Sequence, residues 1–147
     1  METSELRGTD RGGLVRSVIM SYGDGHHAAP RGSALLVDTR VLRNPPEDPA
    51  VRERMLHSNG MVGEVRDYVL ATPGASRLVE RSVEQLLALL DVPPRSGEQP
   101  LRVDVHVVCG GGRHRSVAVA EEIGARARAA GVGCEVEHLH VERPILT

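Results

Sequence analysis

The 147-residue sequence contains no lysine, phenylalanine or tryptophan, and Tyr22 and Tyr68 are its only tyrosines. All 18 of its basic residues are therefore arginines. A P-loop needs a lysine against the β- and γ-phosphates of a nucleotide, so this chain is not an ordinary P-loop NTPase. Proteins that hold single-stranded nucleic acid by stacking need several aromatic side chains, and these are lacking here.

Long apolar runs, cysteines and excess positive charge are also scarce. No segment approaches the roughly 18 apolar residues of a membrane span, and residues 1–13 are too polar for a secretory signal, so we expect a flexible tail there. The two cysteines provide no disulfide framework, and we expect a cytoplasmic protein. With a net charge of −2, any RNA contact would have to come from a local arginine patch.

The apolar pattern predicts strands that alternate with helices. The expected strands cover residues 14–23, 33–40, 101–108 and 134–142. The expected helices are a short one capped at Asp48-Pro49, two within residues 63–92 that break at Thr72-Pro73-Gly74, and one over 115–131 that ends at Gly131. Residues 14–147 thus predict a single α/β domain with a mostly parallel sheet and flanking helices.

The segment CGGGRHRS, residues 109–116, joins the third expected strand to the last helix. The first N–H groups of a helix lack partners, its dipole is positive at that end, and glycine lets the backbone curl around an oxyanion. We therefore favour a phosphate or another anion here over a plain turn with solvated arginines. The candidate ligand-binding residues of the loop are Gly110, Gly111, Gly112, Arg113, His114, Arg115 and Ser116.

The same segment has the Cys-x5-Arg-Ser spacing of cysteine-dependent phosphatases. In such an enzyme Cys109 would attack phosphorus as a thiolate and Arg115 would hold the phosphate oxygens. Asp24, Asp38 and Asp48 are candidates for the acid that protonates the leaving group. Otherwise Cys109 is a small apolar side chain at a strand end.

Five motifs in order resemble the C-terminal domain of the RapZ family of RNase adapter proteins. They read SYGDGH, VDTRVLRNP, DPAVR, SNG and CGGGRHRSVAVAE, and the resemblance covers residues 14 to about 142. Members of that family carry the same Cys-x5-Arg-Ser spacing but are not known as phosphatases. The spacing is therefore weak support for the phosphatase hypothesis.

The resemblance implies a regulatory domain that senses a metabolite, not an enzyme. Family members bind glucosamine-6-phosphate and small regulatory RNAs, so the phosphosugar is expected at the glycine loop. His26 matches a family histidine that would meet the sugar. Asp38 and Arg40 match the family's Asp-Val-Arg and would either contact the ligand or form a structural ion pair.

Three departures from the family pattern matter. No ATPase-like domain with a P-loop is present, so neither a nucleotide nor another cofactor is implied. Gly110 stands where the family has threonine, which removes a hydroxyl donor. The family's basic C-terminal tail is replaced by HLHVERPILT, which weakens the expectation of RNA binding. A homo-oligomer remains possible, because the family forms oligomers.

The seven histidines raise the question of a metal site. Cys134, His138 and His140 would share one strand face, with His106 and Cys109 on a neighbouring strand. No Cys-x2-Cys or His-x3-His spacing supports a zinc site. We therefore expect packed or hydrogen-bonded histidines and no metal.

Overall fold

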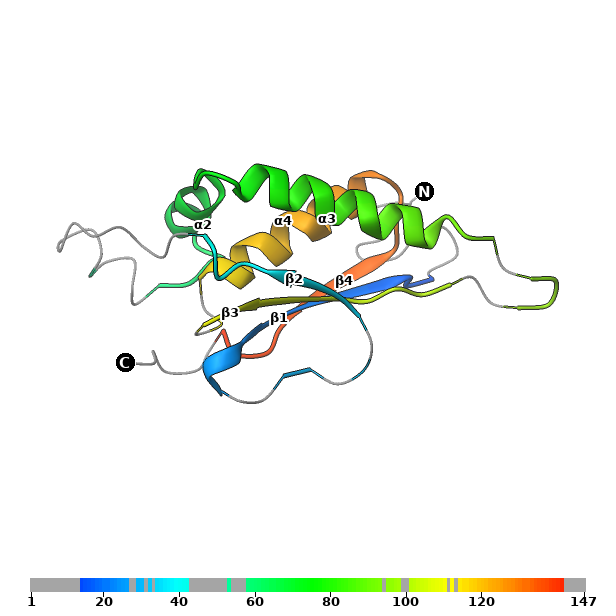
Figure 1. Cartoon of the computed structure of the whole chain (residues 1–147), viewed down its shortest axis with the longest axis horizontal. Helices are drawn as coiled ribbons and strands as arrows, with labels where there is room; N and C mark the ends of the chain where they lie inside the picture. Colours follow the sequence, from blue (N-terminus) through cyan, green and yellow to red (C-terminus); the bar gives the residue numbers. More distant parts are fainter. Residues whose placement is uncertain are drawn as a thin grey trace.

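The parallel sheet of the computed structural model has four strands in the order β2-β3-β1-β4 (Figure 1). The structure describes residues 14–26, 29–30, 32, 34–42, 53, 58–93, 95–98, 101–110, 112 and 114–141. The predicted tail over 1–13 and the helix at Asp48-Pro49 lie outside these residues.

All strand pairs are parallel, which confirms the predicted α/β fold. The strands are β1 (Ser17–Gly23), β2 (Leu35–Asp38), β3 (Val105–Cys109) and β4 (Cys134–His138). Gly23 pairs with Cys109, and Asp38 pairs with Val108. The carboxyl ends of β1, β2 and β3 therefore lie at one edge of the sheet, which we call the carboxyl edge. The opposite edge, where the strands begin, is the amino edge.

Three helices lie together on one face of the sheet (Figure 1). They are α2 (Gly63–Leu70), α3 (Ala75–Leu90) and α4 (Arg115–Ala129), and a short 3-10 helix, η1 (Asp24–His26), follows β1. The predicted break at Thr72-Pro73-Gly74 is confirmed, because Gly74 has φ of +91° and begins α3 as its N-cap.

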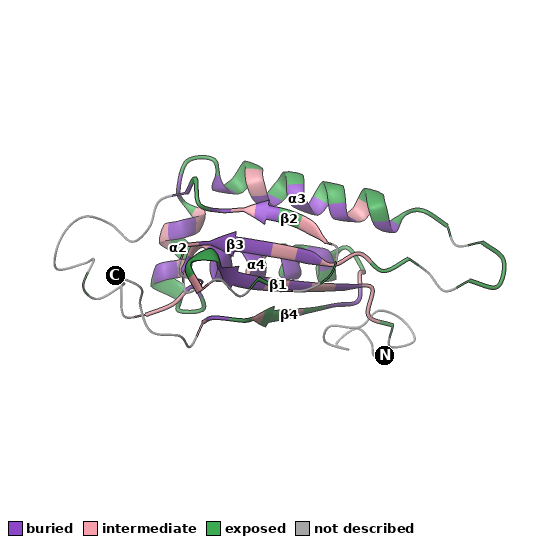
Figure 2. Cartoon of the chain, turned by 60° about the horizontal axis from the view of Figure 1, so that its bottom comes forward, coloured by how far each residue is buried: buried purple, intermediate pink, exposed green. Residues whose placement is uncertain are grey.

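Apolar side chains from the helices and the sheet form the core. In Figure 2 the residues coloured as buried lie mainly on β1, β3 and the helices. Helix α4 lies against the sheet through small residues such as Gly124. A Cβ atom on Gly124 would lie 2.4 Å from Cγ2 of Val136 on β4, so no larger residue fits there. The opposite face of the sheet has partly exposed side chains such as Val18 and Met20.

The observed strands are shorter than the predicted ones. Residues 101–104 continue the alternating pattern, but β3 begins only at Val105. One reason is that the Asp104 carboxylate accepts the N–H of Val18 (3.0 Å), which replaces a backbone partner at this point of the ladder. At the other ends, residues after Asp38 and His138 leave the sheet to form turns at the carboxyl edge. No helix in the described part of the chain is long and apolar enough to cross a membrane.

Candidate functional site

Segments that follow all four strands meet at the carboxyl edge. The N–H of Gly25, in η1, donates to the carbonyl of Gly110 (2.8 Å), and the N–H of Gly23 donates to Nδ1 of His140 (2.8 Å). The connections after β1 and β3 leave toward opposite faces of the sheet (Figure 1). This is the topological arrangement at which α/β sheets bind ligands.

Gly112 allows the loop after β3 to lie directly on β1. Its φ is +81°, a conformation that favours glycine. A Cβ atom there would lie 2.7 Å from the backbone nitrogen of Gly23 and 2.8 Å from Cβ of His140. The predicted need for glycine in this loop thus has two causes, backbone conformation and close packing.

Helix α4 begins at this loop without a side-chain cap on its N-terminus. The N-terminal N–H groups and the helix dipole therefore favour an anion. The turn at Asn59-Gly60 packs on the same first turn of α4. A Cβ atom on Gly60 would lie 2.4 Å from the carbonyl oxygen of His114 and 2.5 Å from the nitrogen of Ala118. The motif SNG, residues 58–60, matches the family pattern, but nothing in the sequence predicts this contact.

Arg115, the first residue of α4, crosses to the turn that follows β2. Its Nη1 donates to the carbonyl oxygens of Arg40 (2.9 Å) and Leu42 (3.1 Å). Its Nε is buried and has no hydrogen-bond partner among the described residues. A buried donor without a partner costs free energy. The Nε–H and one N–H of Nη2 point the same way and form the fork that grips a phosphate or carboxylate with two hydrogen bonds.

Cys109 and Ser116 lie beneath the loop. The Sγ and Oγ atoms are 3.1 Å apart, and Sγ accepts the N–H of Gly112 (3.2 Å). The Cys109 residue is 2% exposed and Ser116 is fully buried. The hydroxyl of Ser116, one of the predicted ligand-binding residues, is thus engaged with the thiol.

Asp38 and Arg40 form an ion pair at the rim. Arg40 donates from Nε and Nη2 to the two carboxylate oxygens of Asp38 (2.9 and 2.8 Å) and from Nη1 to Asp24 (3.2 Å). The hydrogen bond from Arg40 is the main reason that the pKa of Asp38 lies below its ordinary value. Both side chains are a little under half exposed, so the pair positions the turn while remaining accessible from solvent.

Burial raises the pKa of nearby Tyr22, and the negative charge of Asp24 raises it further. Tyr22 therefore stays a neutral phenol at the rim across the physiological range.

His26 is brought to this edge through His140. The two ring centroids are 4.4 Å apart, and His140 is fully buried. Since Nδ1 of His140 accepts the Gly23 N–H, neutral His140 carries its proton on Nε2. Sequence reasoning grouped His140 only with a possible metal site. No spacing signal could have placed it here, because it acts through backbone contacts of the turn after β4.

His138 joins β1, β4 and α4 on the core side of the site. Its Nδ1 lies 2.7 Å from Oγ of Ser21, and its Nε2 lies 2.6 Å from Oε2 of Glu121. This hydrogen bond is the largest cause that lowers the pKa of Glu121. Within the described residues, no group of three or more His, Cys, Asp or Glu side chains is arranged to hold a metal ion.

The carboxyl edge therefore assembles His26, Asp38, Arg40, Gly110, Gly112, His114, Arg115 and Ser116 from the predicted set. Gly111 and Arg113, and the candidate acid Asp48, lie outside the described residues.

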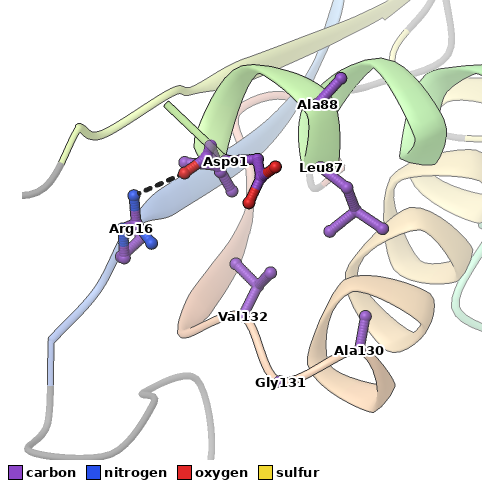
Figure 3. A pocket seen from close by; sticks show the side chains of 8 residues that line it. Arg16, Leu87, Ala88, Asp91, Ala130, Gly131 and Val132 are labelled. Atoms are coloured by element: carbon purple, nitrogen blue, oxygen red, sulfur yellow. Dashed lines mark hydrogen bonds between the residues drawn. The ribbon is translucent and has the colours of Figure 1, made fainter. Parts of the chain in front are cut away.

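A cavity of about 490 Å³ lies at the amino edge, between the C-terminal ends of α3 and α4 (Figure 3). Arg16 lines it beside Leu87, Asp91 and Val132. Its Nε and Nη2 both donate to the carbonyl of Leu101 (3.1 and 2.9 Å), and Nη2 also donates to Leu90 (3.0 Å; Figure 3). The fork of Arg16 is therefore already used by the protein itself.

The sequence model of the RapZ C-terminal domain family matches residues 15–142. Similar proteins include one from Parafrankia, named nucleotide-binding protein, which is 38% identical over 136 residues, 92% of this chain and 45% of the relative. A nucleotide-binding protein from Rubrobacter xylanophilus is 44% identical over 125 residues, 85% of this chain and 39% of the relative. One of the same name from Streptomyces coelicolor is 37% identical over 129 residues, 88% of this chain and 41% of the relative.

The chain thus spans less than half the length of these three relatives. The match nevertheless runs from the start of β1 past the end of β4 and includes the whole carboxyl edge. The chain belongs to the RapZ C-terminal domain family.

Proposed function

We propose that this chain is a non-enzymatic regulatory domain that binds a phosphorylated sugar, such as glucosamine-6-phosphate, at the N-terminus of α4. The observation that carries the proposal is the buried Nε–H of Arg115, which has no partner among the described residues. A phosphate oxygen on this N–H, with a second on Nη2, would satisfy the donor and use the fork that Nη1 does not need.

The surroundings support a phosphate group at this position. The uncapped α4 N-terminus adds backbone donors and a favourable dipole. His26, Asp38 and Arg40 lie around the same edge and would meet the sugar. Similar proteins are named nucleotide-binding. Because this chain has no lysine for a P-loop, we assign its own ligand to the phosphate of a small molecule at α4.

Thermal unfolding with and without ligand tests the proposal. Glucosamine-6-phosphate should raise the unfolding temperature of the wild type, whereas glucosamine, which lacks the phosphate, should not. Arg115→Ala should abolish the rise, and Cys109→Ser should retain it. The absence of stabilisation by any phosphorylated sugar would refute the proposed ligand class.

The alternative function is that of a cysteine-dependent phosphatase. The N–H of Gly112 donates to Sγ of Cys109, as would suit a thiolate, but the residue is only 2% exposed. An attacking sulfur has to reach phosphorus, so burial speaks against this role. Turnover of an aryl phosphate between pH 5 and 8 that Cys109→Ser eliminates would establish the phosphatase.

We further propose that ligand binding regulates an RNA or protein partner in the cytoplasm, where the two free thiols would stay reduced. RNA binding is the weaker choice because the net charge is −2. A gel-shift assay with structured RNA at physiological salt should show weak or no binding. Tight binding that falls steeply with salt would instead identify RNA as the partner.

A further inference from the structure

We propose that Arg115 couples the anion site to the turn Thr39–Leu42, so that ligand binding controls how firmly this turn is held. The inference rests on the proposed function, because it needs an anion on the Arg115 fork. It adds a regulatory output to that binding. The coupling residue and the turn belong to segments that are more than 70 positions apart in the chain.

The turn is well anchored at its two ends. The N–H and the hydroxyl of Thr39 both donate to the carbonyl of Val108 at the end of β3 (2.9 and 2.7 Å). The N–H of Leu42 donates back to Thr39 (3.0 Å), and Leu42 is buried in the core. Between them, Val41 is 82% exposed.

Arg115 restrains the middle of the turn. Its Nη1 donates to the carbonyl oxygens of Arg40 and Leu42, which lie on either side of Val41. The Arg40 side chain in turn pairs with Asp38 and Asp24. The orientation of one guanidinium group therefore affects the backbone that carries Val41 and the ion pairs that reach η1.

A planar guanidinium makes the two functions of Arg115 interdependent. The orientation that directs Nη1 at the two carbonyls buries Nε–H without a partner among the described residues, at a cost in free energy. Turning the group toward water would satisfy Nε but break both contacts with the turn. An anion on the fork removes that cost without moving Nη1, and so stabilises the arrangement that holds the turn.

The consequence is a thermodynamic linkage between ligand binding and the opening of the exposed turn Thr39–Leu42. With the site occupied, residues 40–42 are held and Val41 is presented in one arrangement. With the site empty, the turn opens more often. If opening requires release of the anion, the opening equilibrium falls by a factor of 1 + [ligand]/Kd.

Amide hydrogen exchange of the wild type measures this linkage, with inorganic phosphate as the probe and ¹⁵N-resolved spectra as the readout. The amide groups of Arg40 and Leu42 are hydrogen-bonded, so their exchange reports opening of the turn. At about ten times the Kd of phosphate, exchange at Leu42 should slow by roughly tenfold. Exchange at Val132, at the amino edge, should not change.

Arg115→Lys keeps the positive charge and removes the fork. Without phosphate, exchange at Leu42 should be about tenfold faster than in the wild type, because two hydrogen bonds are lost. Phosphate should then have no effect on it. Arg16→Lys is the matched control, since it removes the equivalent carbonyl contacts at the amino edge and should leave Leu42 unchanged.

Two failures are distinguishable. If phosphate shifts the amide signals of Gly110 and Ser116 but leaves exchange at Leu42 within 1.5-fold, the site exists and the coupling is refuted. If phosphate shifts neither signal at any concentration, both the anion site and the coupling fail. The wild-type titration decides between these outcomes even if a variant does not fold.

Discussion

Arg115 at the carboxyl edge and Arg16 at the amino edge perform the same structural task with different atoms. Each donates to two backbone carbonyls of segments far away in the sequence, those of Arg40 and Leu42 in one case and those of Leu90 and Leu101 in the other. Arg16 uses Nε and Nη2, the pair that forms the fork. Among the described residues, Arg115 donates from Nη1 alone.

This difference supports Arg115, and not Arg16, as the proposed ligand-binding arginine. The cavity beside Arg16 is sizeable, but its guanidinium has no fork left to offer and the helix ends there are C-terminal, where the dipole disfavours anions. At Arg115 the fork adjoins a helix N-terminus. The donors that the fold leaves unused, rather than the position of a cavity, therefore support the proposed site.

Two glycines with the same backbone conformation give the largest expected contrast between the edges. Gly112 has φ of +81° and Gly131 has φ of +90°. Gly131→Ala should cost about 1 kcal/mol, because only the left-handed conformation is strained and the space is open. Gly112→Ala should cost about 3 kcal/mol or more, since its Cβ would also collide with the backbone of Gly23.

Thermal or urea unfolding measures both variants. The unfolding temperature should fall by roughly 10 °C for Gly112→Ala and by about 3 °C for Gly131→Ala. Equal losses of stability in the two variants would mean that the loop after β3 does not pack closely on β1 at Gly112.

Replacing Arg115 or Arg16 with lysine compares the contributions of the two arginines to ligand affinity. Arg115→Lys should weaken the binding of a phosphorylated sugar about 30-fold, because a charge-assisted pair of hydrogen bonds is lost. Arg16→Lys should change the affinity less than twofold. Calorimetric titration gives both values, and an equal loss in the two variants would contradict the assignment of the fork.

Acid should loosen the carboxyl edge through Glu121. The hydrogen bond with His138 holds the pKa of Glu121 below its ordinary value of 4.5. The stabilisation is therefore complete above about pH 4.5 and is lost as the pH falls through the lowered pKa. The stability difference between wild type and Glu121→Gln, about 1–2 kcal/mol at pH 7, should shrink as the pH falls below 4.5 and through the lowered pKa.

Denaturant unfolding across pH 3–7 checks this dependence. The cost of Arg16→Lys serves as the reference, because Arg16 bonds neutral carbonyls and its contribution should be constant over that range. A difference for Glu121→Gln that persists unchanged at pH 3 would show that the carboxylate's charge contributes nothing there.

The smallest effect is expected for the cysteines. Cys109→Ser should change ligand affinity less than twofold and stability by about 1 kcal/mol, since a hydroxyl takes a similar place beside Ser116. Cys134→Ser near the amino edge, equally buried, should behave alike. Alkylation of the folded protein at pH 7 should be slow at both thiols. Rapid, selective alkylation of Cys109 would revive the phosphatase hypothesis.

Much of the fold could be predicted because each element has a local signature. The apolar stripe of Val79, Val83 and Leu86 identifies α3. Gly74 precedes α3 and Gly131 follows α4, and both have a positive φ. The start of β3 could not be predicted, because the alternation from Leu101 fits a longer strand. The Asp104 side chain accepts the N–H of Val18 on β1, 86 positions away in the sequence, and this contact changes the backbone hydrogen bonding between β1 and β3.

The candidate site divides in the same way. The glycine loop and the α4 N-terminus were predicted from a contiguous segment. The contacts of Arg115 with the carbonyls of residues 40 and 42 were not, because any residue has a carbonyl and sequence gives no sign of which one is used. The roles of Gly60 and His140 could not be predicted for a related reason, since both residues act through close contacts that form only after the chain has folded.

A titration of the ¹⁵N-labelled chain with glucosamine-6-phosphate decides whether the ligand binds at the N-terminus of α4. We predict saturable shifts with one Kd at the amides of Gly110, Gly112 and Ser116, none at Gly131 and Val132, and no shifts with glucosamine. Shifts confined to the amino edge, or no shifts at either edge, would contradict it.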